Sequence, residues 1–158
     1  MVNILPQVDK LNRGAWLETE MIIECLRDKE AVTVIGGAVY DGSAGTEMEG
    51  REQWFVKTHG ITTPTFFWKV IVSDPDGLNQ ADGGVIAFWM PNTRKAVARV
   101  ASNYVVSITQ LEANIKAHGG VAESFNMSKP AKDHVPGFWA PLSGCDRSRR
   151  SSTYSAVI

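Results

Sequence analysis

The chain has 158 residues, of which 44% are hydrophobic and 21% are charged, a composition that fits one domain with a modest core of its own. Its formal net charge of −1 at pH 7 excludes an overall positive field that would gather a polyanion, but it leaves room for a local metal site, because a bound cation dominates the field around itself. No apolar run approaches the ~20 residues that span a bilayer, so no membrane partner is expected.

The first part of the chain predicts an extended entry, a helix and a strand. Residues 1–11 are expected to be extended around Pro6, and residues 12–28 to form a helix, because their apolar side chains recur at helical spacing. Cys25 lies among apolar residues of this helix, so we expect it to be a buried thiol. The β-branched run at 31–35 then predicts a buried strand.

The middle of the chain predicts a loop followed by two paired strands. Residues 41–60 are rich in glycine and charge without a clear period, which is typical of a surface loop. Residues 65–73 give the strongest strand pattern in the chain, and residues 84–90 give a second one. The turn sequence Asp74-Pro-Asp-Gly77 follows the first strand, so we expect the two strands to pair antiparallel.

The last part predicts one helix and then irregular structure. Ser107 or Thr109 is expected to cap the helix, and the chain is expected to be irregular from about residue 119. Strands grouped around two helices, without βαβ alternation, predict an α+β fold in which helices pack on an antiparallel sheet. One domain is expected over residues 1–142, followed by a flexible tail at 143–158 that is rich in arginine and serine.

Three residues of the predicted helix form the candidate site. Asn12, Trp16 and Glu20 are spaced by four, and each step of four turns a regular helix about 40° past a full turn, so the three would share one sloping stripe. Amide and carboxylate oxygens suit Mg²⁺, which takes one or two protein ligands and keeps most of its waters. From spacing alone, a capping asparagine and a solvated glutamate are the more usual interpretation.

The segments around these residues resemble a known family. Asn3-Ile-Leu-Pro-Gln7, Leu11-Asn-Arg-Gly-Ala-Trp16 and Glu20 are similar to the metal-site region of the DNA/RNA non-specific endonucleases, which include secreted bacterial nucleases and mitochondrial endonuclease G. Further likenesses to this family follow in order at residues 34–40, 63–69, 87–92 and 104–112.

This resemblance implies a partial ββα-metal nuclease fold and an Mg²⁺-dependent hydrolase of DNA or RNA phosphodiester bonds, with one ion. In the implied site Asn12 binds the metal directly, Glu20 holds metal-bound water and Asn3 supports the site through hydrogen bonds. We expect Trp16 to serve packing. Lys69 and Arg94 are expected either to contact the phosphate backbone or to lie on an ordinary solvated surface.

Two departures from the family pattern leave two interpretations open. The family's general base is a histidine in an Asp-Arg-Gly-His motif before the Asn-x-x-Pro-Gln segment, and this sequence contains no such motif. Glu24 stands where the family places an arginine. The chain is therefore interpreted either as an N-terminally truncated nuclease without its first strands and histidine hairpin, or as a non-catalytic structural or weak nucleic-acid-binding module. The resemblance allows a homodimer and a mitochondrial or secreted location, and any targeting segment would precede Met1.

Overall fold

The structure is a computed structural model that describes residues 5–29, 31–41, 54–73, 84–122 and 124–139. Asn3 and the predicted tail at 143–158 lie outside the described residues, as does the proposed domain boundary at 142. Among the described helices, none is long and apolar enough to cross a membrane.

The central element is an antiparallel sheet of four strands in the order β1-β4-β5-β6. Its strands are β1 (Thr33–Val39), β4 (Phe66–Val72), β5 (Val85–Pro91) and β6 (Val105–Val106). β4 pairs with β5 from Phe66↔Pro91 to Val72↔Val85, which confirms the predicted antiparallel pair. The predicted buried strand at 31–35 is displaced, since β1 begins at Thr33 and continues through both glycines to pair with β4. The prediction of burial is wrong for residues 33–36, which are exposed.

A separate hairpin replaces part of the predicted loop. β2 (Trp54–Val56) and β3 (Ile61–Thr62) pair antiparallel around a 3-10 turn, η3 (Lys57–His59). The loop prediction for 41–60 is therefore wrong at its C-terminal end, and its remaining part at 42–53 lies outside the described residues.

The predicted first helix is three successive pieces: α1 (Asp9–Leu11), the π-helical turn η1 (Asn12–Trp16) and α2 (Leu17–Arg27). It starts three residues earlier than predicted and is interrupted at Gly14, whose φ of −109° and ψ of −116° are not helical. Cys25 in α2 is buried and disulfide-bonded, so the prediction of a thiol is wrong. Two cysteines far apart in the sequence do not show by their spacing whether a bond forms between them, which is why it was not predicted.

The C-terminal helices follow the 3-10 turn η5 (Ala101–Tyr104). α3 (Ile108–Ala117) is capped by Ser107, whose hydroxyl accepts a hydrogen bond from the Gln110 N–H, as predicted. A further short helix, α4 (Lys129–Asp133), lies in the region predicted to be irregular.

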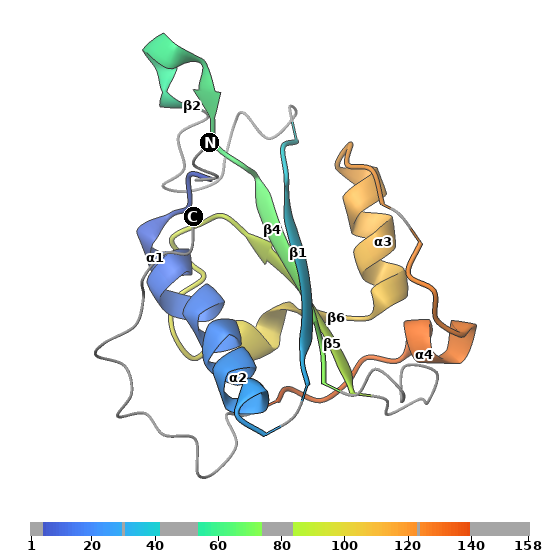
Figure 1. Cartoon of the computed structure of the whole chain (residues 1–158). Helices are drawn as coiled ribbons and strands as arrows, with labels where there is room; N and C mark the ends of the chain where they lie inside the picture. Colours follow the sequence, from blue (N-terminus) through green and yellow to red (C-terminus); the bar gives the residue numbers. More distant parts are fainter. Residues whose placement is uncertain (1–4, 30, 42–53, 74–83, 123, 140–158) are drawn as a thin grey trace.

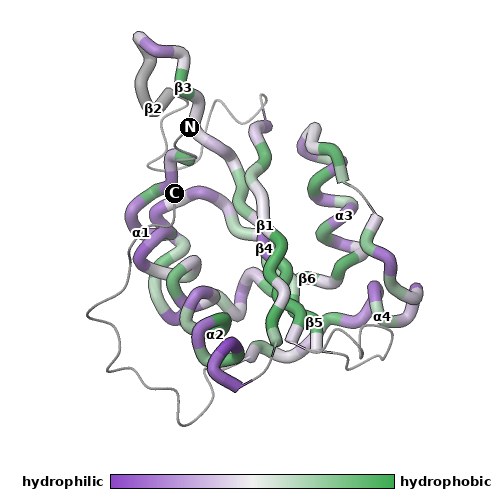
Figure 2. The backbone as a smooth tube through the Cα atoms, in the orientation of Figure 1, coloured by the Kyte–Doolittle hydropathy of each residue, from purple (hydrophilic) through white to green (hydrophobic). Residues whose placement is uncertain are grey.

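The sheet is covered on both faces, by α2 on one and α3 on the other (Figure 1). Because side chains alternate along a strand, Phe67 and Ile71 of β4 pack toward α2 while Val70 and Val72 pack toward α3. Burial on both faces explains why β4 and β5 read as continuous apolar runs. Figure 2 shows these apolar strands at the centre, with more hydrophilic stretches along α1 and α2.

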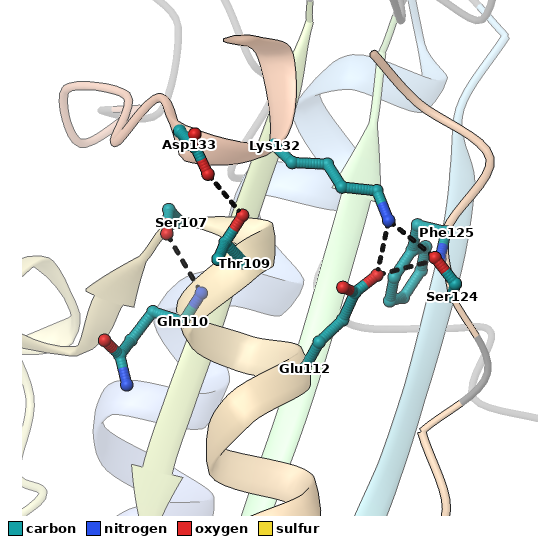
Figure 3. A network of polar contacts seen from close by, with 8 residues as sticks. All are labelled: Ser107, Thr109, Gln110, Glu112, Ser124, Phe125, Lys132 and Asp133. Carbon is teal, nitrogen blue, oxygen red and sulfur yellow. Dashed lines mark hydrogen bonds and ion pairs between the residues drawn. The ribbon is translucent and has the colours of Figure 1, made fainter. Parts of the chain in front are cut away.

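Polar contacts hold α4 against α3 (Figure 3). The Lys132 ammonium lies 2.8 Å from the Glu112 carboxylate and donates to Ser124 Oγ at 2.7 Å. Glu112 also accepts from the Phe125 N–H at 2.9 Å. Burial raises the pKa of Glu112, but these two hydrogen bonds and the nearby lysine charges outweigh it, so the pKa lies below its usual value.

Candidate active site on the first helical segment

Gly14 interrupts the helix because another part of the chain packs directly on it. A Cβ at this position would lie 2.5 Å from the Ala96 carbonyl oxygen and 2.6 Å from the Val97 carbonyl carbon. The Ala15 N–H donates to the same Ala96 oxygen at 3.2 Å. The interruption also means that the regular-helix geometry used to predict a stripe of Asn12, Trp16 and Glu20 does not hold in this segment.

Asn12 and Glu20 both keep their side-chain oxygens available. Asn12 is exposed, and its backbone N–H donates to the Val8 carbonyl at 2.9 Å. Glu20 is half-buried in the first turn of α2. Neither side chain makes a hydrogen bond or ion pair with any of the residues that the structure describes.

The surroundings of these two groups suit a hydrated hard cation rather than a metal caged by protein. Within the described part of the chain, no three His, Cys, Asp or Glu side chains come together as a metal cluster. An amide oxygen and one carboxylate are the small donor set with which Mg²⁺ retains its waters. The Gln7 Nε2 group, five residues before Asn12 in the entry segment, is buried and has no hydrogen-bond partner among the described residues. A water or an anionic oxygen would relieve that cost.

Lys69 lies inside the protein, between β4 and α2, and not at the surface as predicted. It is 5% exposed, because its position in β4 directs it to the same face as Phe67 and Ile71. Its ammonium donates to Thr19 Oγ1 at 2.7 Å and lies 3.7 Å from the centre of the Trp16 ring. This burial removes Lys69 from the candidate phosphate contacts.

The environment of Lys69 lowers the pKa of its ammonium, and its hydrogen bond to Thr19 connects it to the first turn of α2. Burial lowers the pKa of Lys69 from 10.5 to about 8, although the negative charge of Glu20 acts in the opposite direction. Thr19 is fully buried, and its hydroxyl donates in turn to the Trp16 carbonyl at 2.7 Å. The Trp16 ring packs edge-on against Phe67 at 5.6 Å, in agreement with a packing role.

Asn92 anchors the entry segment, a role that sequence reasoning missed. It is fully buried, and its amide nitrogen donates to the Pro6 carbonyl at 3.2 Å and to the Pro64 carbonyl at 2.9 Å. Its amide oxygen accepts from the Val8 N–H at 2.7 Å. The bonds to Pro6 and Val8 fix the chain shortly before Asn12, and the third ties it to Pro64 before β4. A Pro-Asn pair at the end of a buried strand was the available signal.

Glu18 anchors the segment from its other side. Its carboxylate accepts from the Ala101 N–H at 2.9 Å and from the Arg99 N–H. The stretch from Asn92 to Ala101 is thereby held at both ends against the helix, with Gly14 between the two anchors. Arg94 is exposed in this stretch, as predicted for a solvent-facing position.

The described histidines belong to other elements than Asn12 and Glu20. His118 follows α3 on the other face of the sheet, where its Nδ1 lies 2.5 Å from Asp41 Oδ2 and its ring packs against Phe66 and Trp89. His59 is exposed in η3, and His134 follows α4.

Comparison with known proteins places these features in a family. The model of a family described as DNA/RNA non-specific endonuclease matches residues 1–124. Among curated proteins, the mitochondrial Nuclease 1 of Schizosaccharomyces pombe is 30% identical over 118 residues, which cover 70% of this chain and 35% of that protein. The chain thus spans about a third of the length of this relative. The anchors at Glu18, Lys69 and Asn92 all lie within the matched residues.

Proposed function

This chain belongs to the DNA/RNA non-specific endonuclease family, and on that premise we propose that it carries the metal-binding half of a nuclease site. In this proposal Asn12 binds one Mg²⁺ ion directly and Glu20 holds water of that ion. The observation that carries the proposal is an exposed amide and a half-buried carboxylate on one helical segment, neither with a hydrogen bond or ion pair among the described residues. The chemical fit is that of a hard cation with few protein ligands.

The proposed reaction is hydrolysis of a phosphodiester bond in DNA or RNA. When bound, the ion would polarise the scissile phosphate and stabilise the leaving oxygen. The protein's own part is to orient the ligands: Asn92 fixes the chain before Asn12, while Lys69 and Thr19 order the turn that ends at Glu20. Asn3 is proposed to support the site through hydrogen bonds, although it lies outside the described residues.

A general base is the component for which this sequence offers no candidate near the site. No histidine follows an Arg-Gly pair, and His118 lies across the sheet. General base catalysis contributes about 10²–10⁴-fold in rate, so we expect slow hydrolysis by this chain alone.

A second candidate function is a non-catalytic structural or nucleic-acid-binding module, and Glu24 is the observation that favours it. Glu24 lies one turn beyond Glu20 in α2, at the position where the family pattern has an arginine. A carboxylate repels the negative charge that develops on a phosphate during cleavage.

Plasmid nicking with Mg²⁺ or with EDTA separates the two candidates. We expect Mg²⁺-dependent nicking that is lost in Asn12→Ala and retained in Asn126→Ala, an exposed asparagine beyond α3 that serves as the matched control. Mn²⁺ binding, measured by electron paramagnetic resonance, should also weaken in Asn12→Ala. Nicking that is equal in both variants would overturn the metal role of Asn12. DNA binding without nicking or Mn²⁺ binding would favour the second candidate.

A second copy of this chain is a further proposed partner, supported by the edge strand β1. Val34 and Ile35 lie on opposite faces of this strand and are 42% and 41% exposed. The strand carries no lysine or proline, the residues with which proteins commonly protect an edge. Light scattering during size exclusion should find a dimer that Ile35→Lys converts to a monomer; a monomeric wild type at high concentration would contradict this proposal.

A further inference from the structure

The stretch from Asn92 to Ala101 has a charge pattern that differs from the rest of the chain. Residues 84–111 contain no aspartate or glutamate, and all their formal charge comes from Arg94, Lys95 and Arg99. The chain as a whole is close to neutral, with a net charge of −1. All three basic residues are exposed. They therefore form a local positive surface on one connection between elements.

This basic stretch lies directly beside the candidate site. After β5 the chain curves past α1 and α2 (Figure 1), and it touches the helical segment at Gly14, two residues from Asn12. The Glu18 carboxylate, two residues from Glu20, holds its far end through the Arg99 and Ala101 N–H groups. The exposed arginines consequently lie on a stretch that packs against the helical segment carrying the two proposed metal-site residues.

Arg99 has a backbone conformation that the surrounding contacts impose. Its φ of +68° makes it the one non-glycine residue with positive φ in the described part of the chain. L-residues rarely adopt this conformation, and it persists only where neighbouring structure fixes it. Glu18 provides that fixation, because it binds the Arg99 N–H itself and the N–H two residues later. The Arg99 side chain makes no hydrogen bond or ion pair with the described residues.

We propose that Arg99, together with Arg94, contacts the phosphate backbone of the nucleic acid, and that Glu18 sets the position of Arg99. The proposal rests on the proposed function for the class of ligand, which is a polyanion of phosphodiesters. A guanidinium suits this ligand because its planar donors match two phosphate oxygens. Contacts of this kind position the backbone and carry no base specificity.

The test measures binding of a fluorescein-labelled DNA duplex of about 20 base pairs. Fluorescence anisotropy reports the affinity in EDTA at a series of salt concentrations. Each phosphate contact contributes a slope of about 0.9 in log K against log salt, which corresponds to about eightfold in affinity at 0.1 M salt. We expect Arg99→Gly to lose about that factor and to lower the slope by about 0.9. Arg27→Gln removes the same charge from the exposed end of α2 and should change neither value.

Two further measurements separate a phosphate contact from a structural role. Glycine accepts positive φ without strain, so Arg99→Gly should unfold at a temperature no lower than the wild type. Glu18→Gln should also weaken binding, but it should add little once Arg99 is already glycine, because it acts through that residue.

The proposal is overturned if Arg99→Gly leaves the slope unchanged, if Arg27→Gln lowers it equally, or if the wild type does not bind the duplex in EDTA. Its failure is distinguishable from that of the proposed function. If duplex affinity depends on Arg99 but nicking does not depend on Asn12, the phosphate contact stands and the metal site is rejected. Nicking that depends on Asn12 but not on Arg99 would do the reverse.

Discussion

Replacing Lys69 with methionine tests the electrostatic environment beneath the candidate site. The buried ammonium has a pKa of about 8 instead of 10.5, and a factor of ten in a protonation equilibrium corresponds to ~1.4 kcal/mol. The folded state therefore disfavours the charged lysine by ~3 kcal/mol at pH 7, where it is protonated in both the folded and unfolded states. Methionine has a similar length and no charge. It gives up the bond to Thr19 and the cation–π contact with the Trp16 ring, each worth ~1 kcal/mol, so Lys69→Met should be ~1 kcal/mol more stable at pH 7.

The pH dependence gives this prediction a definite sign. Because the folded-state pKa of Lys69 is depressed, the unfolded state binds more protons between pH 8 and 10.5, and wild-type stability rises across that range. The difference in stability between Lys69→Met and the wild type should thus fall by ~2.5 kcal/mol between pH 7 and pH 10, which makes the variant the less stable protein at pH 10. Burial also raises the pKa of Tyr104, but both proteins contain this tyrosine, so its effect cancels in the difference.

The assay is urea unfolding of both proteins under oxidising conditions at several pH values from 7 to 10, with the difference in unfolding free energy plotted against pH. A difference that stays constant over this range would refute the assigned burial of the charged lysine. A variant that is less stable than the wild type at pH 7 would show that the contacts with Thr19 and Trp16 outweigh the cost of burial.

Three other substitutions test packing within the fold, two of them beside the candidate site. Asn92→Ala leaves three buried backbone groups without partners and should lower the unfolding free energy by ~3 kcal/mol or more in urea titrations. Gly14→Ala forces a Cβ against the backbone and should cost ~2 kcal/mol by the same measurement, whereas Gly137→Ala, which meets nothing within 4 Å, should change it by less than ~0.5 kcal/mol. Lys132→Met should cost up to ~1 kcal/mol at pH 7 and progressively less as the pH falls below 4.5, because the depressed pKa of Glu112 supports folding above its usual value of 4.5 and that support disappears as the pH falls through the folded-state value.

Local patterns were sufficient for the parts of the fold that local interactions determine. The apolar runs of β4 and β5 and the cap at Ser107 depend on neighbouring residues, and the structure confirms them. The interruption at Gly14 escaped prediction because the helical spacing of apolar residues continues across it. Its cause is the approach of Ala96, which no window along the sequence contains.

The sequence indicated the proposed metal ligands of the candidate site, but not the residues that hold those ligands in position. Asn12 and Glu20 were found by their spacing and their resemblance to a family, and they remain proposals. Lys69 was placed at the surface because lysine is rarely buried, and only the pairing of β4 shows which face of the sheet it occupies. Glu18 and Asn92 were missed because their partners are 83 and 84 residues away in the sequence.

The long-range anchoring of Asn92 has a consequence for how the protein folds. The bond between the Val8 N–H and Asn92 spans 84 residues, and the bond to the Pro6 carbonyl spans 86. Closing such long loops costs chain entropy before any contact compensates it, so these bonds are expected to form after the β4–β5 pairing has ordered Asn92. During synthesis the entry segment leaves the ribosome well before its anchor, and until then it stays available to proteases and chaperones. Hydrogen exchange during refolding should therefore protect the β4 and β5 amides before that of Val8.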